Sequence, residues 1–231
     1  MMQAMSPHPL RHKLLQAAGE THMGGRPHNE DVVLLRPDLA LYAVADGAGG
    51  LEAGNVAASV AVAALARFVE RGLARLARSP EIDALGLPVA ARLLSAAAHA
   101  ANAELLAVAR GGARERGMAT TLLAALFSIE YRAVHLAHVG DSRCYRLRAG
   151  TIDRLTDDHT VARDILETRP ALGEISLSHL PGRVATRALG MSNELRVSVR
   201  SLEIVEGDRY LLCSDGLHQA VERAALLEVI G

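Results

Sequence analysis

Three aspartates stand next to a glycine at the ends of predicted apolar strands, and a fourth follows a glutamate just before one. They are Asp46 before Gly47, Asp215 before Gly216, Asp141 after Gly140, and the pair Glu30-Asp31. A single Asp-Gly step is more often a tight turn than a ligand. Four acidic clusters are a stronger indication, because strand ends meet at one edge of a sheet and Mg²⁺ and Mn²⁺ prefer carboxylate oxygens. Without a cation these carboxylates would repel one another and their pKa values would rise. The spacing therefore predicts a divalent-metal site.

Other kinds of catalytic site find little support in the sequence. It contains neither a Gly-x-Ser-x-Gly elbow nor a glycine-rich phosphate loop that ends in Gly-Lys-Ser or Gly-Lys-Thr. Cys144 and Cys213 both fall in predicted strands, which favours buried core cysteines over nucleophiles. His135 and His138 lie three residues apart in one strand and so on opposite faces, and we do not expect them to share a zinc ion.

The elements that must position these residues come in runs. Short apolar segments predict strands at residues 32–35, 39–45, 119–129, 133–138, 143–148, 151–155, 195–205 and 209–213. Helical periodicity and charge placement predict helices at residues 52–78, 88–110, 158–168 and 217–230. Residues 173–183 are expected to be irregular. Runs of strands with paired helices between them favour antiparallel sheet layered with helices, an α+β fold.

The composition excludes several classes of protein. The 231 residues are 50% hydrophobic with a net charge of −1, which excludes disorder and gives no general attraction to nucleic acid. Two cysteines exclude a disulfide scaffold. The longest apolar run, at residues 56–65, is too short to span a membrane. Because the first residues carry no signal peptide, we expect a cytoplasmic protein with one domain at residues 12–231 after a flexible segment at residues 1–11.

The order of the motifs resembles that of the metal-dependent protein serine/threonine phosphatases of the PPM (PP2C) family, in their compact bacterial form. The matching segments are Arg26 with Asn29-Glu30-Asp31, Val44-Ala45-Asp46-Gly47-Ala48-Gly49-Gly50, Met118-Ala119-Thr120-Thr121, His138-Val139-Gly140-Asp141-Ser142-Arg143, Leu155-Thr156-Asp157-Asp158-His159, Thr186-Arg187-Ala188-Leu189-Gly190 and Leu212-Cys213-Ser214-Asp215-Gly216-Leu217. A co-linear set of this size, from residue 12 to the C-terminus, is far more specific than any one motif.

The resemblance implies both a fold and a metal centre. The fold is a four-layer α-β-β-α sandwich of two antiparallel sheets flanked by helix pairs. At one end of this sandwich the family binds two Mn²⁺ or Mg²⁺ ions, with a third, weaker site in bacterial members. By position, Asp46 matches the aspartate that bridges the two ions. Gly47 matches the residue that offers its carbonyl oxygen.

The resemblance also implies roles for five further residues. Asp215 matches a carboxylate ligand of the second ion, and Asp141 matches the residue that joins it at the third. Asp31 matches an acidic residue near the first ion, and Glu30 matches the neighbouring acid that binds metal in some members. Arg26 matches the arginine that holds the substrate phosphate, a task for which a guanidinium has the right geometry.

The implied reaction is the hydrolysis of phosphoserine and phosphothreonine in proteins by a metal-activated water. The implied partners are phosphorylated proteins of a bacterial Ser/Thr kinase system. A monomer is expected, with no nucleic-acid partner and no membrane span.

Three departures from the family pattern qualify this expectation. Ala48 stands where animal members have a histidine, which bacterial members usually lack as well. Ala119 stands where the family usually has glycine. The family also continues past the Asp215 motif to an Asp-Asn motif, which supplies another ligand of the second ion, and to a last strand; neither occurs before Gly231. We therefore expect the last strand to be missing and the second ion to bind less tightly. The alternative function is a metal-poor pseudophosphatase or phosphoprotein-binding regulatory module.

Overall fold

The computed structural model describes residues 15–49, 53–76, 87–111, 117–168 and 185–231. The predictions for the flexible segment at residues 1–11 and the irregular segment at residues 173–183 lie outside the described residues. The same holds for the two ends of the helix predicted at residues 52–78.

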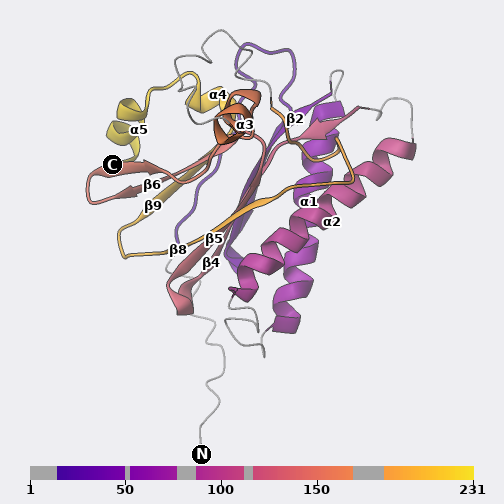
Figure 1. Cartoon of the computed structure of the whole chain (residues 1–231). Helices are drawn as coiled ribbons and strands as arrows, with labels where there is room; N and C mark the ends of the chain where they lie inside the picture. The colour runs from indigo at the N-terminus through magenta and orange to yellow at the C-terminus, as the bar shows by residue number, and fades with distance from the viewer. Residues whose placement is uncertain (1–14, 50–52, 77–86, 112–116, 169–184) are drawn as a thin grey trace, which may run out of the picture.

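The larger sheet has six antiparallel strands and carries two long helices on one face (Figure 1). The strands are β1 (Asp31–Arg36), β2 (Leu41–Ala48), β3 (Ala119–Thr120), β4 (Leu122–Ser128), β5 (Ala133–Val139) and β8 (Ser198–Glu203). Their order is β1-β2-β4-β5-β8, and β3 pairs with the end of β2. The helices are α1 (Ala53–Leu76) and α2 (Val89–Gly111).

The smaller sheet lies on the other face of the larger one and is covered in turn by short helices near the C-terminus (Figure 1). Its strands are β6 (Arg143–Arg148), β7 (Thr151–Arg154) and β9 (Arg209–Cys213), in the order β7-β6-β9. The remaining elements are α3 (Val161–Thr168), α4 (Asp215–His218), α5 (Arg223–Ile230) and the 3₁₀ turns η2 (Pro37–Leu39) and η3 (Ile129–Tyr131). The predicted α-β-β-α sandwich is confirmed.

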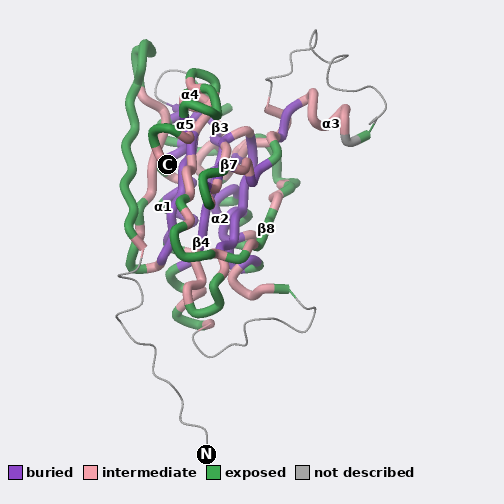
Figure 2. The backbone as a smooth tube through the Cα atoms, turned by 90° about the vertical axis from the view of Figure 1, so that its left-hand side faces the viewer, coloured by how far each residue is buried: buried purple, intermediate pink, exposed green. Residues whose placement is uncertain are grey.

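Strand alternation builds the core between these layers. On β4, Leu122, Ala124 and Leu126 belong to the cluster that packs under α1 and α2. Leu123 and Ala125, on the opposite face of the same strand, belong to the cluster shared with the smaller sheet. Burial is therefore concentrated in the inner elements, as the tube in Figure 2 shows.

The prediction of one helix over residues 217–230 is wrong. The chain forms α4, turns, and then forms α5. The carbonyl of Leu217 accepts the amides of both Ala220 and Val221, and Glu222 is extended, with ψ at 150°. The turn allows α5 to place Leu226 against Ile152 and its neighbours on the outer face of the smaller sheet.

Other predicted boundaries also shift. The single strand predicted at residues 119–129 is two strands, β3 and β4, of which β4 also pairs with β5. The strand predicted at residues 39–45 begins at Leu41, because Pro37 opens a 3₁₀ turn and Ala40 is left-handed, with φ at 51°. The helix predicted at residues 158–168 begins at Val161, because Thr160 first forms a bridge with Ala185. The strand predicted at residues 195–205 is confined to Ser198–Glu203.

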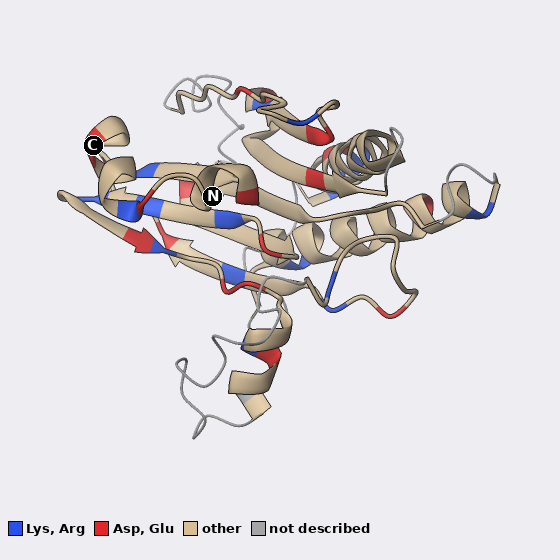
Figure 3. Cartoon of the chain, turned by 90° about the horizontal axis from the view of Figure 1, so that it is seen from above, with Lys and Arg blue, Asp and Glu red and all other residues tan. Residues whose placement is uncertain are grey.

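Among the described residues, neither the distribution of charge nor the apolar character of the helices marks out one face of the molecule. Basic and acidic positions are interspersed over the elements seen in Figure 3. Within the described ranges, no helix has the length and apolar character needed to cross a bilayer.

Candidate metal centre

Asp46 lies at the centre of a group of aspartates. It stands near the end of β2, directly opposite Asp31 in the register with β1. Its carboxyl group also interacts with those of Asp31 and Asp215. Burial, together with these two neighbouring carboxyl groups, raises the pKa of Asp46 to about 8. Two strand ends of the larger sheet and the start of α4 therefore bring three carboxyl groups together. The expected single sheet edge is not what joins them, because Asp215 follows β9 of the smaller sheet.

Asp215 links this group to the loop after β5. Burial, aided by the charges of Asp215 and Asp158, raises the pKa of Asp141 above its usual value. Asp215 thus acts electrostatically on both Asp46 and Asp141. Its own carboxyl group accepts a hydrogen bond from Gln219 at 2.9 Å. The four aspartates singled out in the sequence therefore form one connected acidic site.

Two residues without a predicted role, Ser214 and His218, connect the segments that carry these aspartates. The hydroxyl of Ser214 donates to Asp31 Oδ2 at 2.7 Å and so ties β1 to the start of α4. His218 Nε2 donates to the backbone carbonyl of Asp141 at 3.0 Å and ties α4 to the loop after β5. Ser214 lies within a recognised motif, whereas nothing in the sequence marks His218.

Thr121 joins the two strand ends that carry Asp46 and Asp141. The amide of Asp46 donates to Thr121 Oγ1 at 3.0 Å, and the amide of Thr121 donates to the carbonyl of Asp46 at 2.9 Å. Thr121 Oγ1 also lies 2.8 Å from Ser142 Oγ. Both hydroxyls are buried, so this link does not depend on water.

The loop after β5 is held at Gly140. Its amide donates to His159 Nδ1 at 3.1 Å, and its carbonyl accepts the amide of His159 at 3.0 Å. Gly140 has φ at +106°, and a Cβ there would lie 2.6 Å from Thr121 Cγ2. A glycine is therefore required at this position, on grounds of both conformation and space.

Gly47 and Glu30 meet the beginning of α1. The amide of Gly47 donates to the carbonyl of Glu30 at 3.2 Å. A Cβ on Gly47 would overlap the carbonyl of Gly54, so only glycine permits this approach. The Glu30 carboxyl group packs beside Gly54 in the first turn of α1, where the helix dipole favours a negative charge. No contact of that carboxyl group with the aspartates is recorded among the described residues.

Arg26 lies in a turn in which its amide donates to the carbonyl of Met23 at 3.1 Å. Its side chain is exposed, and among the described residues it has no recorded contact with the aspartates. The structure thus gathers Asp31, Asp46, Asp141 and Asp215 and leaves Arg26 at the surface.

The donor set of this site fits a divalent cation. Carboxylate oxygens are hard ligands, and a divalent ion would relieve the repulsion that raises the pKa of Asp46. Within the part of the chain that the structure describes, no three Asp, Glu, His or Cys side chains stand ready to hold an ion in their present positions.

The cysteines do not offer a rival nucleophile. Cys144 and Cys213 are buried and unpaired, as predicted. Burial raises the pKa of the Cys213 thiol to about 12 and raises that of Cys144 as well. Neither thiol is therefore ionised near neutral pH.

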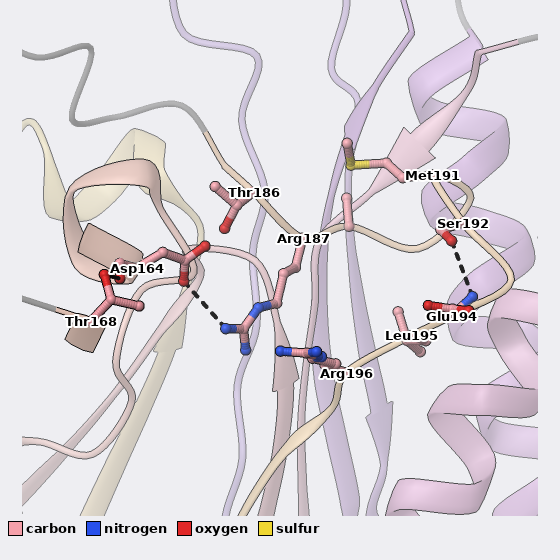
Figure 4. A pocket seen from close by; sticks show the side chains of 10 residues that line it. Asp164, Thr168, Thr186, Arg187, Met191, Ser192, Glu194, Leu195 and Arg196 are labelled. Carbon is pink, nitrogen blue, oxygen red and sulfur yellow. Dashed lines mark hydrogen bonds and ion pairs between the residues drawn. The ribbon is translucent and has the colours of Figure 1, made fainter. Parts of the chain in front are cut away.

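A pocket of about 420 Å³ lies beside α3 (Figure 4). Its lining comes from α3 and from the segment at residues 186–196, and it includes Arg187, Arg196 and Glu194. Arg187 donates to Asp164 of α3 at 3.2 Å.

Known proteins with similar sequences share this architecture. A family model described as Protein phosphatase 2C matches residues 18–230. The serine/threonine protein phosphatase PstP of Mycobacterium tuberculosis is 35% identical over 205 residues, which cover 89% of this chain and 36% of that protein. The serine/threonine phosphatase stp of Listeria innocua is 32% identical over 208 residues, which cover 89% of this chain and 78% of that protein.

A solved structure agrees with these matches. It is the catalytic domain of the serine/threonine protein phosphatase PstP in complex with two manganese ions, with a TM-score of 0.70 and 34% identity. The match covers 89% of this chain and 79% of that one. The chain spans only about a third of the length of the full mycobacterial protein. With the family model matching nearly its whole length, this chain belongs to the protein phosphatase 2C family.

Proposed function

We propose that this chain hydrolyses phosphoserine and phosphothreonine in proteins at a centre that binds two Mn²⁺ or Mg²⁺ ions. The observation that carries the proposal is the pairing of Asp46 with Asp31 across β1 and β2, with Asp215 near enough to help raise the pKa of Asp46. A buried cluster of carboxylates is costly unless a cation compensates it. A similar chain whose structure contains two manganese ions supports the same reading of the cluster.

Each candidate residue receives a role in this proposal. Asp46 would hold both ions, with the carbonyl oxygen of Gly47 as a further ligand. Asp215 binds the second ion and, with Asp141, forms a third, weaker site. Asp31 holds the first ion or its water molecules. Ser214 supports the last role, because its hydroxyl already orients the Asp31 carboxylate.

Two outlying residues complete the proposed site. Glu30 shares a backbone hydrogen bond with Gly47 and so stands next to the bridging position, although its carboxyl group packs against α1. Arg26 is exposed, which suits a side chain that holds the phosphate of an incoming phosphoprotein. Its planar guanidinium can donate to two phosphate oxygens at once.

The chain itself binds and orients the substrate while the ions act on the water. When bound, the two ions supply an activated water and stabilise charge on the phosphoryl group. The carboxylates keep the ions in place, Arg26 aligns the phosphate, and no side chain has to form a covalent intermediate. The thiols of Cys144 and Cys213 are buried and protonated, which is consistent with a reaction that uses no covalent side-chain intermediate.

The proposal also covers the substrates of the chain, its oligomeric state and its location. We propose that the substrates are phosphoproteins of a bacterial Ser/Thr kinase system and that the chain acts as a cytoplasmic monomer. The names of the similar proteins, which are serine/threonine phosphatases of bacteria, support the substrate class.

The test is hydrolysis of p-nitrophenyl phosphate and of a phosphothreonine peptide with Mn²⁺. Wild-type chain should turn over both, chelation with EDTA should abolish turnover, and Asp46→Asn should lower it by about 100-fold or more. Asp153→Asn, a change on β7 in a partly exposed ion pair with Arg146, is the matched control and should leave turnover unchanged. No turnover by wild type, together with tight binding of the phosphopeptide, would instead support the phosphoprotein-binding alternative.

A further inference from the structure

The pocket beside α3 is linked to the candidate metal centre through backbone hydrogen bonds. The amide of Thr186, a lining residue, donates to the carbonyl of His159 at 2.9 Å. His159 in turn holds Gly140, the residue before Asp141. Leu189, a buried residue next to the lining residue Ala188, exchanges two backbone hydrogen bonds with Thr120, whose hydroxyl donates to the carbonyl of Asp46. The pocket lining and the aspartates are therefore joined by the same set of hydrogen-bonded segments.

Two guanidinium groups face the same part of this pocket. Figure 4 shows the side chains of Arg187 and Arg196 directed toward one another across it. Among the described residues, the guanidinium of Arg187 hydrogen-bonds to Asp164 through one nitrogen, and a guanidinium has further N–H donors. Arg196 is exposed, and within the described ranges it forms no ion pair. An anion placed between them can accept hydrogen bonds from both guanidinium groups.

The lining also carries two carboxylates, those of Asp164 and Glu194. Asp164 is paired with Arg187, so this pair contributes little net charge and Arg196 is the cation left to attract an anion. Glu194 lies on the side of Ser192, whose hydroxyl accepts the amide of Glu194 at 3.0 Å (Figure 4). Met191, which is 60% exposed, adds an apolar surface for the stem of a bound side chain. The lining is thus suited to a side chain with an apolar stem and an anionic end.

We propose that this pocket binds a glutamate or aspartate side chain that flanks the phosphorylated residue of the substrate, with Arg196 as the contacting residue. The inference rests on the proposed function, because it assigns a substrate preference to the same site. A second phosphoryl group has the same charge chemistry, and the experiment below distinguishes it from a carboxylate.

The experiment uses phosphothreonine peptides that differ at one flanking position. Glutamate, glutamine and phosphoserine are compared at each position in turn, and both dissociation constants and kcat/KM are measured. For wild type, one position should favour glutamate over glutamine by about threefold, the size expected for a partly exposed ion pair. A preference for phosphoserine without one for glutamate would overturn the assignment to a carboxylate, and equal values for all peptides would overturn the site itself.

Two variants of opposite sign test the residue assignment. Arg196→Gln should remove the glutamate preference, and Glu194→Gln should increase it, because the first removes a positive charge and the second a negative one. Arg223→Gln, which removes an exposed arginine on α5, is the matched control and should keep the wild-type preference. An unchanged preference in both pocket variants would overturn the proposal. Wild-type turnover of p-nitrophenyl phosphate tests the proposed function separately, and the dissociation constants report the peptide preference whether or not turnover occurs.

Discussion

The hydroxyl oxygens of Thr121 and Ser142 lie 2.8 Å apart in the core, between two strand ends that each carry an aspartate of the candidate centre. Because Thr121 Oγ1 also accepts the amide of Asp46, one buried hydroxyl sets the spacing between Asp46 and Asp141. The metal centre thus depends on a neutral hydrogen-bonded link as well as on its carboxylates.

Replacing Thr121 should therefore weaken metal binding. Thr121→Val keeps the shape of the side chain but leaves the amide of Asp46 and the hydroxyl of Ser142 without this partner, at a cost of about 1–3 kcal/mol in stability. We expect calorimetry to show Mn²⁺ affinity reduced by about tenfold or more, as for other residues that orient metal ligands. Thr121→Ser retains the hydroxyl and should bind Mn²⁺ nearly as wild type does. Equal affinity in all three proteins would contradict a role for the link.

Gly140 should tolerate alanine less well than another glycine of similar backbone conformation. Gly140→Ala adds a Cβ next to Thr121, whereas Gly150, with φ at +76°, has no atom within 4 Å of the added Cβ. Alanine at a positive φ lowers the stability of both variants by about 1 kcal/mol, but only Gly140→Ala also adds a clash. Urea unfolding should show a larger loss of stability for Gly140→Ala, and equal losses would argue against the crowding at Gly140.

Protonation of His159 should destabilise the fold in weak acid. Burial, aided by the nearby charges of His138 and Arg187, lowers the pKa of His159 to about 4. Its Nδ1 already accepts the amide of Gly140, and its ring stacks on His138 with centroids 4.6 Å apart. The unfolded chain takes up this proton near pH 6.5, so it binds more protons than the folded chain between about pH 6.5 and 4. The contribution of neutral His159 to stability is therefore complete above that window and is lost as the pH falls through it.

This pH effect can be separated from other titrating groups by a variant. His159→Gln removes the titrating ring, so its stability should fall less steeply than that of wild type from pH 7 to pH 4.5. His99→Gln, on the exposed part of α2, serves as the control and should follow the wild-type curve. If the His159→Gln curve runs parallel to that of wild type, His159 is not the group responsible.

The order of the layers and part of the gathering of the aspartates follow from local patterns in the sequence. Asp46 lies near the end of β2 and Asp215 follows β9 at the start of α4, and both precede glycines. Strand pairing explains why Asp31 and Asp46 are opposite each other, whereas the approach of Asp215 depends on how the two sheets pack. The division of the last helix into α4 and α5 could not be predicted, because it depends on how Leu226 reaches the smaller sheet.

Contacts between distant segments were beyond a prediction from local patterns. Thr121 and Ser142 are 21 residues apart, and Ser214 meets Asp31 across 183 residues. Each motif marked its residues, but only the packed sheets bring the hydroxyls and carboxylates within hydrogen-bonding distance. The convergence of Arg187 and Arg196 on one pocket has the same origin, since neither residue type nor spacing specifies where two guanidinium groups point.

Calorimetric titration of the folded chain with Mn²⁺ tests the central claim most directly. If Asp31, Asp46 and Asp215 form a binuclear centre, wild type should bind two ions, and Asp46→Asn should lose most of that binding while remaining folded. Binding of no ion by wild-type chain, or equal binding by Asp46→Asn, would contradict the assignment of the aspartates as the metal centre.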